Sequence, residues 1–301
     1  MTTRRDFLAA TAALGAGALL DAAPPAGGAG RGELFGISLA QWSLHRALRG
    51  GELGHLEFAQ KARSFGLDAV EYVNQFFSER AADFEYLAEM KRRADGEGVQ
   101  SLLIMIDGEG ELADADAARR RKAVENHFKW AVAARYLGCH SIRVNAGGSG
   151  EPEEQMKRAA DSLNAIADLA EPYQVSVIVE NHGGLSSNGA WLAGVMRLAA
   201  NPRVGTLPDF GNFEIAKDQW YDRYQGVAEL MPFAKAVSAK SHAFDAEGNE
   251  TRTDYLRMLR IVVDAGYRGR VGIEFEGDGI SEDEGIRRTR ALLERVRDRL
   301  G

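Results

Sequence analysis

Residues 175–184 read Val-Ser-Val-Ile-Val-Glu-Asn-His-Gly-Gly, and the fold is decided by stretches of this kind. An almost wholly apolar run is followed by a carboxylate, Glu180, and by an imidazole, His182, two positions later. Such a run is typical of a strand that is buried on both faces of a parallel sheet. Polar groups directly after it would lie at the carboxyl edge of that sheet, where ligands bind in α/β proteins.

Eight runs of this type alternate with longer segments in which apolar residues recur every three or four positions. The predicted strands are residues 34–42, 69–73, 101–106, 141–145, 175–180, 205–209, 236–242 and 271–276, and the clearest helical segments are 84–94, 117–137, 154–169, 191–200, 255–265 and 284–300. Each parallel strand needs a helical crossover before the next one. The pattern therefore predicts a single-domain α/β fold over residues 31–301, a (β/α)8 TIM barrel, with a doubly wound open sheet as the alternative.

Composition excludes several classes of protein. The 301 residues contain one cysteine, so no internal disulfide can form, and the hydrophobic content of 45% is that of an ordinary globular protein. The net charge is −7, with 37 basic and 44 acidic side chains that are interleaved along the chain. Nucleic acid and anionic membranes are therefore poor partners for this surface.

The first thirty residues differ from the rest of the chain. Arg4 and Arg5 precede an apolar stretch, residues 8–20, and then a coil rich in Ala, Pro and Gly. This arrangement looks like a twin-arginine signal, cleaved between residues 23 and 30, and predicts export to the periplasm or cell envelope without a remaining membrane anchor. An Ala-rich tail or an uncleaved anchor is the alternative, although 13 apolar residues are fewer than the roughly 20 that span a bilayer.

Four consecutive predicted strands end in ionisable side chains. Glu180 ends the fifth, Asp209 the sixth, His242 the seventh, and Glu274 lies near the end of the eighth. Three carboxylates converging inside a barrel would repel one another unless a cation lies between them, because buried charge is costly unless it is paired or bound to a metal. A divalent metal ion is the simplest such cation.

The same order of residues resembles the xylose-isomerase-like TIM-barrel superfamily of sugar phosphate isomerases and epimerases. The likeness covers nearly the whole chain after residue 30 and includes Ser38 to Leu44, Ile142 to Asn145, Val179 to His182 and Gly272 to Gly277. It implies one divalent metal held by Glu180, Asp209, His242 and Glu274. Three oxygen ligands and one nitrogen suit Mn²⁺ best, with Mg²⁺, Co²⁺ and Zn²⁺ as alternatives.

The resemblance also implies a mechanism. Glu180 and Glu274 would be the acid and base that move a proton next to a sugar carbonyl, and the metal would stabilise the ene-diolate that forms. Lys240 lies two positions before His242, on the same face, where it is either an acid, base or substrate clamp, or a salt bridge in the barrel wall. His182 is either a proton-moving or substrate-contacting group, or a residue that orients Glu180.

The chain departs from the epimerase pattern at two positions. Asn212 stands three residues after Asp209, where those enzymes commonly carry a histidine, and Gly248 stands where they carry an arginine that Arg252 would have to replace. The remaining substrate contacts are weighed against structural roles. Glu71 would bind a sugar hydroxyl or form an ion pair with Lys240. Arg143, Asn145 and Trp42 would contact the substrate or have structural roles in the barrel.

Four functions compete on these residues. The first is a metal-dependent isomerase or epimerase of a small carbohydrate, and the second is a lyase that eliminates the C1 substituent of a 3-keto-glycoside at the same site. A phosphodiesterase of the endonuclease IV type would need more histidine ligands and a basic groove. A non-catalytic sugar-binding barrel would not need two opposed carboxylates. A homo-oligomer is compatible with any of them.

Overall fold

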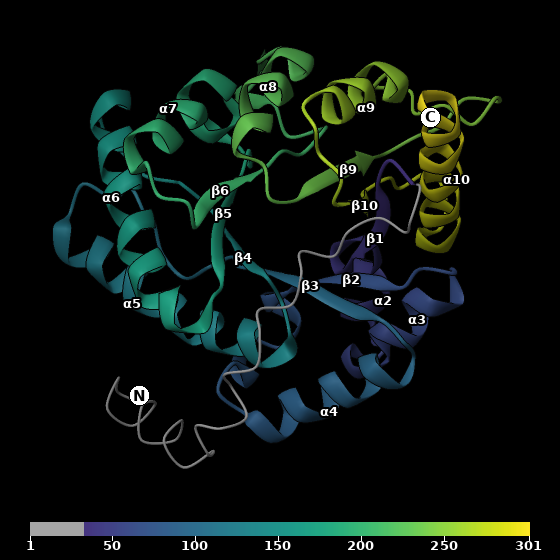
Figure 1. The fold of residues 1–301 in the computed structure, drawn as a ribbon, viewed down its shortest axis with the longest axis horizontal. Helices are drawn as coiled ribbons and strands as arrows, with labels where there is room; N and C mark the ends of the chain where they lie inside the picture. The colour runs from purple at the N-terminus through teal and green to yellow at the C-terminus, as the bar shows by residue number, and fades with distance from the viewer. Residues whose placement is uncertain (1–32) are drawn as a thin grey trace.

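The structure is a computed structural model that describes residues 33–301, so the predicted export signal lies outside the described residues. Within them, eight parallel strands form the centre and helices form the outer layer (Figure 1). The strands are β1 (Gly36–Ala40), β2 (Ala69–Val73), β3 (Gln100–Met105), β4 (Ser141–Val144), β5 (Ser176–Glu180), β6 (Val204–Leu207), β9 (Val237–Ser241) and β10 (Arg270–Phe275). The prediction of a (β/α)8 barrel is confirmed.

The strands follow one another around the barrel in chain order. The ladder runs β6-β5-β4-β3-β2-β1-β10-β9, and the gap between β6 and β9 is closed by isolated parallel bridges. The amide of Ser238 donates to the carbonyl of Pro208 at 2.9 Å, and the amide of Phe210 donates to the carbonyl of Ser238 at 3.1 Å. Asp209 is thereby held against β9, which brings the carboxyl ends of the sixth and seventh barrel strands together.

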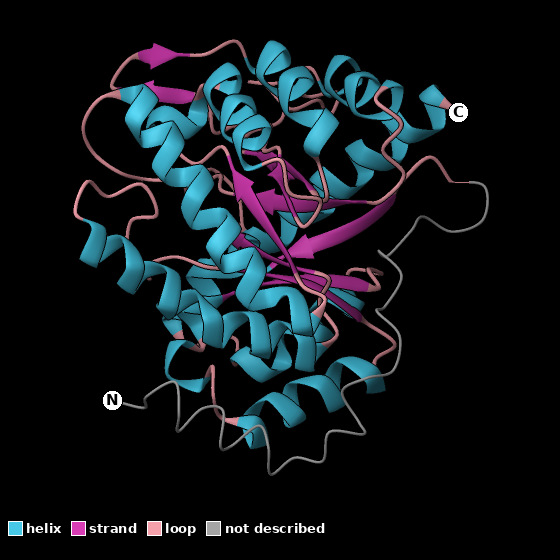
Figure 2. Cartoon of the chain, turned by 60° about the vertical axis from the view of Figure 1, so that its left-hand side comes forward, coloured by secondary structure: helices cyan, strands magenta, loops and turns pink. Residues whose placement is uncertain are grey.

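Helices cover the outside of every strand (Figure 2). They are α2 (His45–Gly50), α3 (Phe58–Ser64), α4 (Phe84–Gly96), α5 (Ala117–Leu137), α6 (Pro152–Ala170), α7 (Gly189–Ala199), α8 (Arg223–Leu230), α9 (Tyr255–Asp264) and α10 (Glu282–Leu300). Sequence signals set their ends. Asp116 accepts hydrogen bonds from the first amides of α5, and Gly138 ends that helix in the left-handed region at φ 86°.

Two apolar clusters separate the layers. The main core lies between strands and helices, and a smaller cluster lies within the ring of strands: Ala40, Val73, Leu103, Met105, Ile178, Leu207 and Ala236. The polar side chains of the strands share the interior with this smaller cluster, because side chains alternate between the two faces of a strand. None of the helices between residues 33 and 301 combines the length and hydrophobicity needed to cross a bilayer.

Three predicted strand ends differ from the structure in ways that matter for the site. The first strand stops at Ala40, and residues Gln41–Leu44 form a 3₁₀ helix. The sixth stops at Leu207, because Pro208 has no amide to continue the ladder. The seventh stops at Ser241, so His242 begins a loop.

A two-stranded hairpin follows β6 and was not anticipated. Its strands are β7 (Glu214–Ala216) and β8 (Gln219–Trp220), and they stand apart from the central strands (Figure 2). Both strands are too short to give a periodic signal.

Candidate active site

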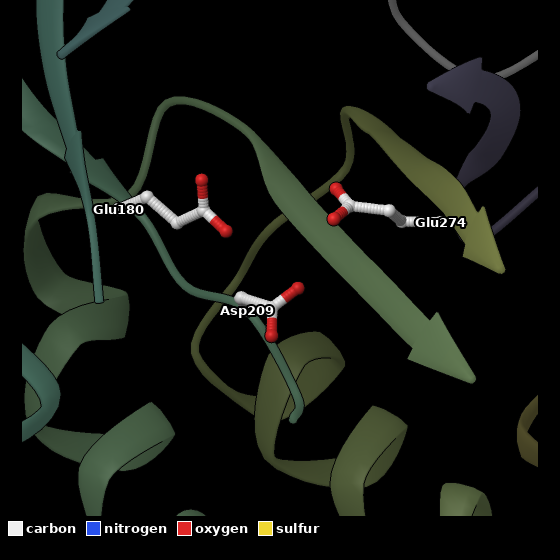
Figure 3. Close-up of side chains that lie close together, drawn as sticks. All are labelled: Glu180, Asp209 and Glu274. Atoms are coloured by element: carbon white, nitrogen blue, oxygen red, sulfur yellow. The ribbon is translucent and has the colours of Figure 1, made fainter. Parts of the chain in front are cut away.

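Glu180, Asp209 and Glu274 converge inside the barrel, and we call them the acidic triad. One carboxylate oxygen of each residue lies within 4.8 Å of the others, and all three side chains are buried. The carboxylates point toward one another from β5, from the loop after β6 and from β10 (Figure 3). Three of the four side chains implied as metal ligands are therefore brought together.

His242 is the exception, because it is not part of this group of carboxylates. Its amide donates to Glu250 at 3.2 Å, and its ring lines a pocket at the mouth of the barrel. Burial, with Arg252 and Lys240 nearby, lowers the pKa of His242 to about 4. The imidazole is thus neutral at pH 7, as a ligand would be, but it lies outside the cluster formed by the acidic triad.

Two buried cations enter the cluster from neighbouring strands. Lys240 Nζ lies 2.8 Å from Glu274 Oε1 and 2.9 Å from Glu276 Oε2. Arg143 Nε lies 2.9 Å from Glu180 Oε2, and its Nη1 lies 2.7 Å from Asp107 Oδ1. The prediction that a cation must accompany the carboxylates is met in part by the chain itself, and Lys240 forms the salt bridge that was one of its two predicted roles.

Polar side chains fix the loop that carries Asp209. The side chain of Asn181 accepts from the amide of Asp209 at 2.8 Å and donates to the carbonyls of Asp209 and Asn212. Asn212 Nδ2 in turn donates to Glu180 Oε1 at 2.9 Å. Ser238 Oγ lies 2.7 Å from Asp209 Oδ2 and 3.3 Å from Glu274 Oε2. Asn212 therefore positions Glu180 as well as lining the site.

Burial is the main cause of the raised pKa values of Glu180 and Asp209. It raises the pKa of Glu180 to about 7, with Glu274 acting in the same direction against the opposing charge of Arg143. It also raises the pKa of Asp209 to about 7, although Lys240 opposes the shift. Burial alone would lower the pKa of Lys240, but Glu274, Asp209 and Glu276 outweigh it and hold that pKa well above its usual range. Lys240 is therefore an ammonium ion.

An inner pocket of about 310 Å³ is lined by one member of the acidic triad, Glu274. Its walls include Trp42, Asp107, Arg143, His182, Glu274 and Glu276. Trp42 Nε1 donates to Glu276, and the Trp42 ring stacks on His45 with centroids 5.0 Å apart. Of the two glutamates expected to act as acid and base, Glu274 faces this pocket, whereas Glu180 is covered by Arg143 and Asn212.

An outer pocket of about 320 Å³ adjoins it. Its walls include His182, Asn212, Glu214, Trp220, Arg223, His242 and Arg252. His182 lines both pockets, and burial, with Arg143 and Lys240 next, lowers its pKa. Arg143 and Asn212, and not His182, hold Glu180 in position. His182 instead forms part of the wall that the two pockets share.

Two predicted substrate contacts have structural partners. Glu71 is 1% exposed and accepts from Ser38 Oγ at 2.6 Å, so the suggested ion pair with Lys240 is wrong. Burial raises the pKa of Glu71 to about 7, which favours its neutral form near neutral pH. Asn145 donates to Asp107 Oδ1 at 2.8 Å and supports the partner of Arg143.

Sequence reasoning missed Asp107, Asn181, Ser238, Glu276 and Arg223. The alternation of strand side chains would have found two of them, since Ser238 lies two positions before Lys240 and Glu276 two positions after Glu274. Asp107 follows the third strand, as Glu180 ends the fifth. The two remaining residues lie in loops and on α8, where no such periodicity applies.

A family model of the xylose isomerase-like TIM barrel matches residues 59–296. The chain belongs to this family. A search among curated proteins finds no match. The barrel of strands and its ring of helices are thus those of a xylose isomerase-like protein.

Solved structures share the fold at low identity. A D-tagatose 3-epimerase-like protein is 16% identical, with a TM-score of 0.69 over 89% of this chain and 100% of that one. The 3-keto-D-glucoside 4-epimerase of E. coli is 15% identical, with a TM-score of 0.65 over 87% and 99%. The zinc-bound IOLI protein is 12% identical, with a TM-score of 0.70 over 88% and 99%.

The spacing of the acidic triad fits a divalent ion in this xylose isomerase-like barrel. Its three carboxylates could each give one oxygen, and hard cations prefer such ligands. A divalent ion would compete with Lys240 for this site, because the ammonium of Lys240 already lies against Glu274.

Proposed function

We propose that the chain is a carbohydrate isomerase or epimerase that moves a proton next to the carbonyl of a keto sugar. The observation that carries the proposal is the position of Glu274, which lines the inner pocket beside Lys240, with Arg143 in another wall of the same space. A carboxylate next to fixed cations suits proton abstraction that leaves an ene-diolate, because the cations lie where negative charge develops. Family membership and the sugar epimerases of similar fold support this reaction class.

The roles follow from what each side chain faces. Glu274 takes the proton from the carbon next to the carbonyl, and Lys240 and Arg143 stabilise the oxyanion. Return of that proton from Glu274 to the neighbouring carbon gives the isomer, and protonation of the original carbon on its other face by a water molecule gives the epimer. Trp42, in the wall of the inner pocket, packs against the sugar ring.

A divalent ion held by the acidic triad would supply further positive charge next to the substrate carbonyl. Mn²⁺ is the ion that we test first, because three carboxylate oxygens suit it. Glu180 and Asp209 would then serve as ligands of that ion, and Glu180 would not take the substrate proton itself, because Arg143 and Asn212 cover it. His242 would complete the ligands only after a rotation toward the acidic triad.

A second function is favoured by the outer pocket. Two adjoining spaces with His182 between them offer room for a sugar ring and for a group attached to it. In a 3-keto-glycoside, loss of the C2 proton to Glu274 would expel the C1 substituent into the outer pocket, with His182 beside the leaving oxygen. Export of the chain, if it occurs, would bring it to glycosides outside the cytoplasm.

One experiment separates these functions. The protein is incubated in deuterated water with D-fructose, D-tagatose or p-nitrophenyl 3-keto-β-D-glucoside, each in EDTA and in Mn²⁺. Deuterium at the epimerised or isomerised carbon supports the first function, and release of p-nitrophenol supports the second. Neither signal in either buffer, together with sugar binding by calorimetry, would favour a non-catalytic barrel and overturn both enzyme functions.

A further inference from the structure

The pairing of β9 with β10 places the ammonium of Lys240 beside the acidic triad. In the β9–β10 ladder, Lys240 is the paired neighbour of Glu274, so the two side chains leave the strands at the same level. Only 3% of Lys240 is exposed, and its ammonium lies between Glu274 and Glu276. A β-carbon at position 211 would lie 3.0 Å from Lys240 Cδ, so Gly211 leaves room for the lysine stem.

Five of the six carboxylate oxygens of the acidic triad accept a hydrogen bond or pair with the ammonium of Lys240, and the sixth, Glu180 Oε2, lies beside Arg143 Nε without a hydrogen bond. Glu180 has Asn212 and Arg143, each at 2.9 Å. Asp209 Oδ1 accepts from the amides of Gly211 and Asn212 at 2.8 Å, and its Oδ2 accepts from Ser238. Glu274 has Lys240 and Ser238. Buried carboxylates are stabilised by such charged partners, and cationic side chains of the chain already lie beside Glu180 and Glu274.

A divalent ion would compete with this arrangement. To bind all three carboxylates it would share Glu274 with Lys240 or displace it, and in either case the buried ammonium would lie close to two added positive charges. His242, which would offset part of this cost as a neutral ligand, lies outside the group.

We propose that the ammonium of Lys240 is the resident cation of the acidic triad, and that it excludes a divalent ion from tight binding there. The ammonium of Lys240, which bridges Glu274 and Glu276, neutralises the carboxylates in place of a metal ion. The consequence for activity rests on the proposed function: proton transfer at Glu274 proceeds in EDTA. The binding consequence does not depend on any substrate.

The test measures metal binding directly. Wild type and Lys240→Met are stripped with EDTA, dialysed and titrated with MnCl₂ by calorimetry. Methionine keeps most of the length of the stem without the charge. Lys240→Met is expected to bind one Mn²⁺ with about 10- to 100-fold higher affinity than wild type, the scale on which neighbouring groups change metal affinity. His242→Ala serves as the control, and its weak Mn²⁺ binding should equal that of wild type.

Thermal unfolding gives a second measurement, and its comparison of wild type in EDTA and in Mn²⁺ does not need the variant. Wild type is expected to unfold at the same temperature in EDTA and in Mn²⁺, whereas Lys240→Met is destabilised in EDTA and recovers in Mn²⁺. Tight stoichiometric Mn²⁺ binding by wild type, a rise of several degrees in its unfolding temperature with Mn²⁺, or loss of that binding in His242→Ala would overturn the proposal. If Lys240→Met does not fold, the wild-type titration and melting curves decide alone.

Discussion

Lys240 of β9 and Glu274 of β10 form a buried ion pair across neighbouring parallel strands, with Nζ and Oε1 2.8 Å apart. The pair depends on strand register, because a shift of one residue would turn one of the two side chains to the helical layer. It sets the base of the proposed reaction beside a fixed positive charge. On the other edge of β9, a parallel bridge places Ser238 next to Asp209, so one strand serves two members of the acidic triad.

Glu274→Gln should abolish turnover while the protein still folds. The amide keeps the shape of the side chain but cannot take a proton, and a positioned acid or base typically contributes about 10²–10⁴-fold to the rate. Glu276 remains as an ionic partner for Lys240, so the ammonium is not left alone. The measurement is deuterium incorporation into the keto sugar, together with cooperative thermal unfolding.

Glu154→Gln is the matched control for that substitution. Glu154 lies on the surface and pairs with Lys157 within α6. Its turnover should equal that of wild type. If Glu274→Gln retained more than about a tenth of the activity, the assignment of the base would be wrong.

Arg143→Met should destabilise the fold strongly. It leaves Glu180 and Asp107 without their common cation, and breaking a buried ion pair from one side typically costs about 3–5 kcal/mol. The double variant with Glu180→Gln should recover part of this loss, since one uncompensated charge is removed. Urea denaturation at pH 7 measures both. Arg119→Met, on the surface beside Asp114, should leave the midpoint unchanged, and equal losses in the two arginine variants would contradict the argument.

Much of the fold was predictable because the decisive signals are local. Strands β2 and β4 and helix α5 coincide with their predicted ranges or differ by one residue, since apolar runs and helical periods lie within a few neighbouring positions. Pro208 shows where a local rule overrode the pattern, because the ladder of β6 stops before it. The hairpin of β7 and β8 gave no such signal.

The site was predictable only for what strand ends reveal. Glu180, Asp209 and Glu274 follow from the positions of carboxylates along single strands. Which cation neutralises them depends on pairing between strands, as for Lys240 and Glu274, which are 34 residues apart in the sequence. The charge argument was sound, but positions along single strands could not show that Lys240 pairs with Glu274 and Arg143 with Glu180.

Glu71→Gln should change how stability depends on pH. Burial raises the folded-state pKa of Glu71 from 4.5 to about 7, so the folded chain binds that proton more tightly than the unfolded chain does. The free energy of unfolding therefore falls as the pH rises from about 4.5 to about 7, by up to about 3 kcal/mol for this group. Glu71→Gln should remove that part of the fall and be the more stable protein at pH 8. Urea denaturation at pH 5 and pH 8 measures the free energy of unfolding of both proteins, with exposed Glu79→Gln as the control. If that free energy changed equally between the two pH values in wild type and in Glu71→Gln, Glu71 would be charged in the folded protein.

Trp220→Ala should separate the two proposed functions. Trp220 is 58% exposed on β8 and lines the outer pocket, where an aromatic ring can stack on a group attached to the sugar. Loss of that stacking should raise KM for the 3-keto-glycoside about 3- to 10-fold and leave KM for a ketohexose unchanged. Leu198→Ala is the control, because Leu198 is the other large apolar side chain exposed in residues 33–301 and lies on α7, outside both pockets. Steady-state kinetics on both substrates measures the effect. Equal KM values for wild type and Trp220→Ala on the glycoside would mean that the outer pocket does not hold its C1 substituent.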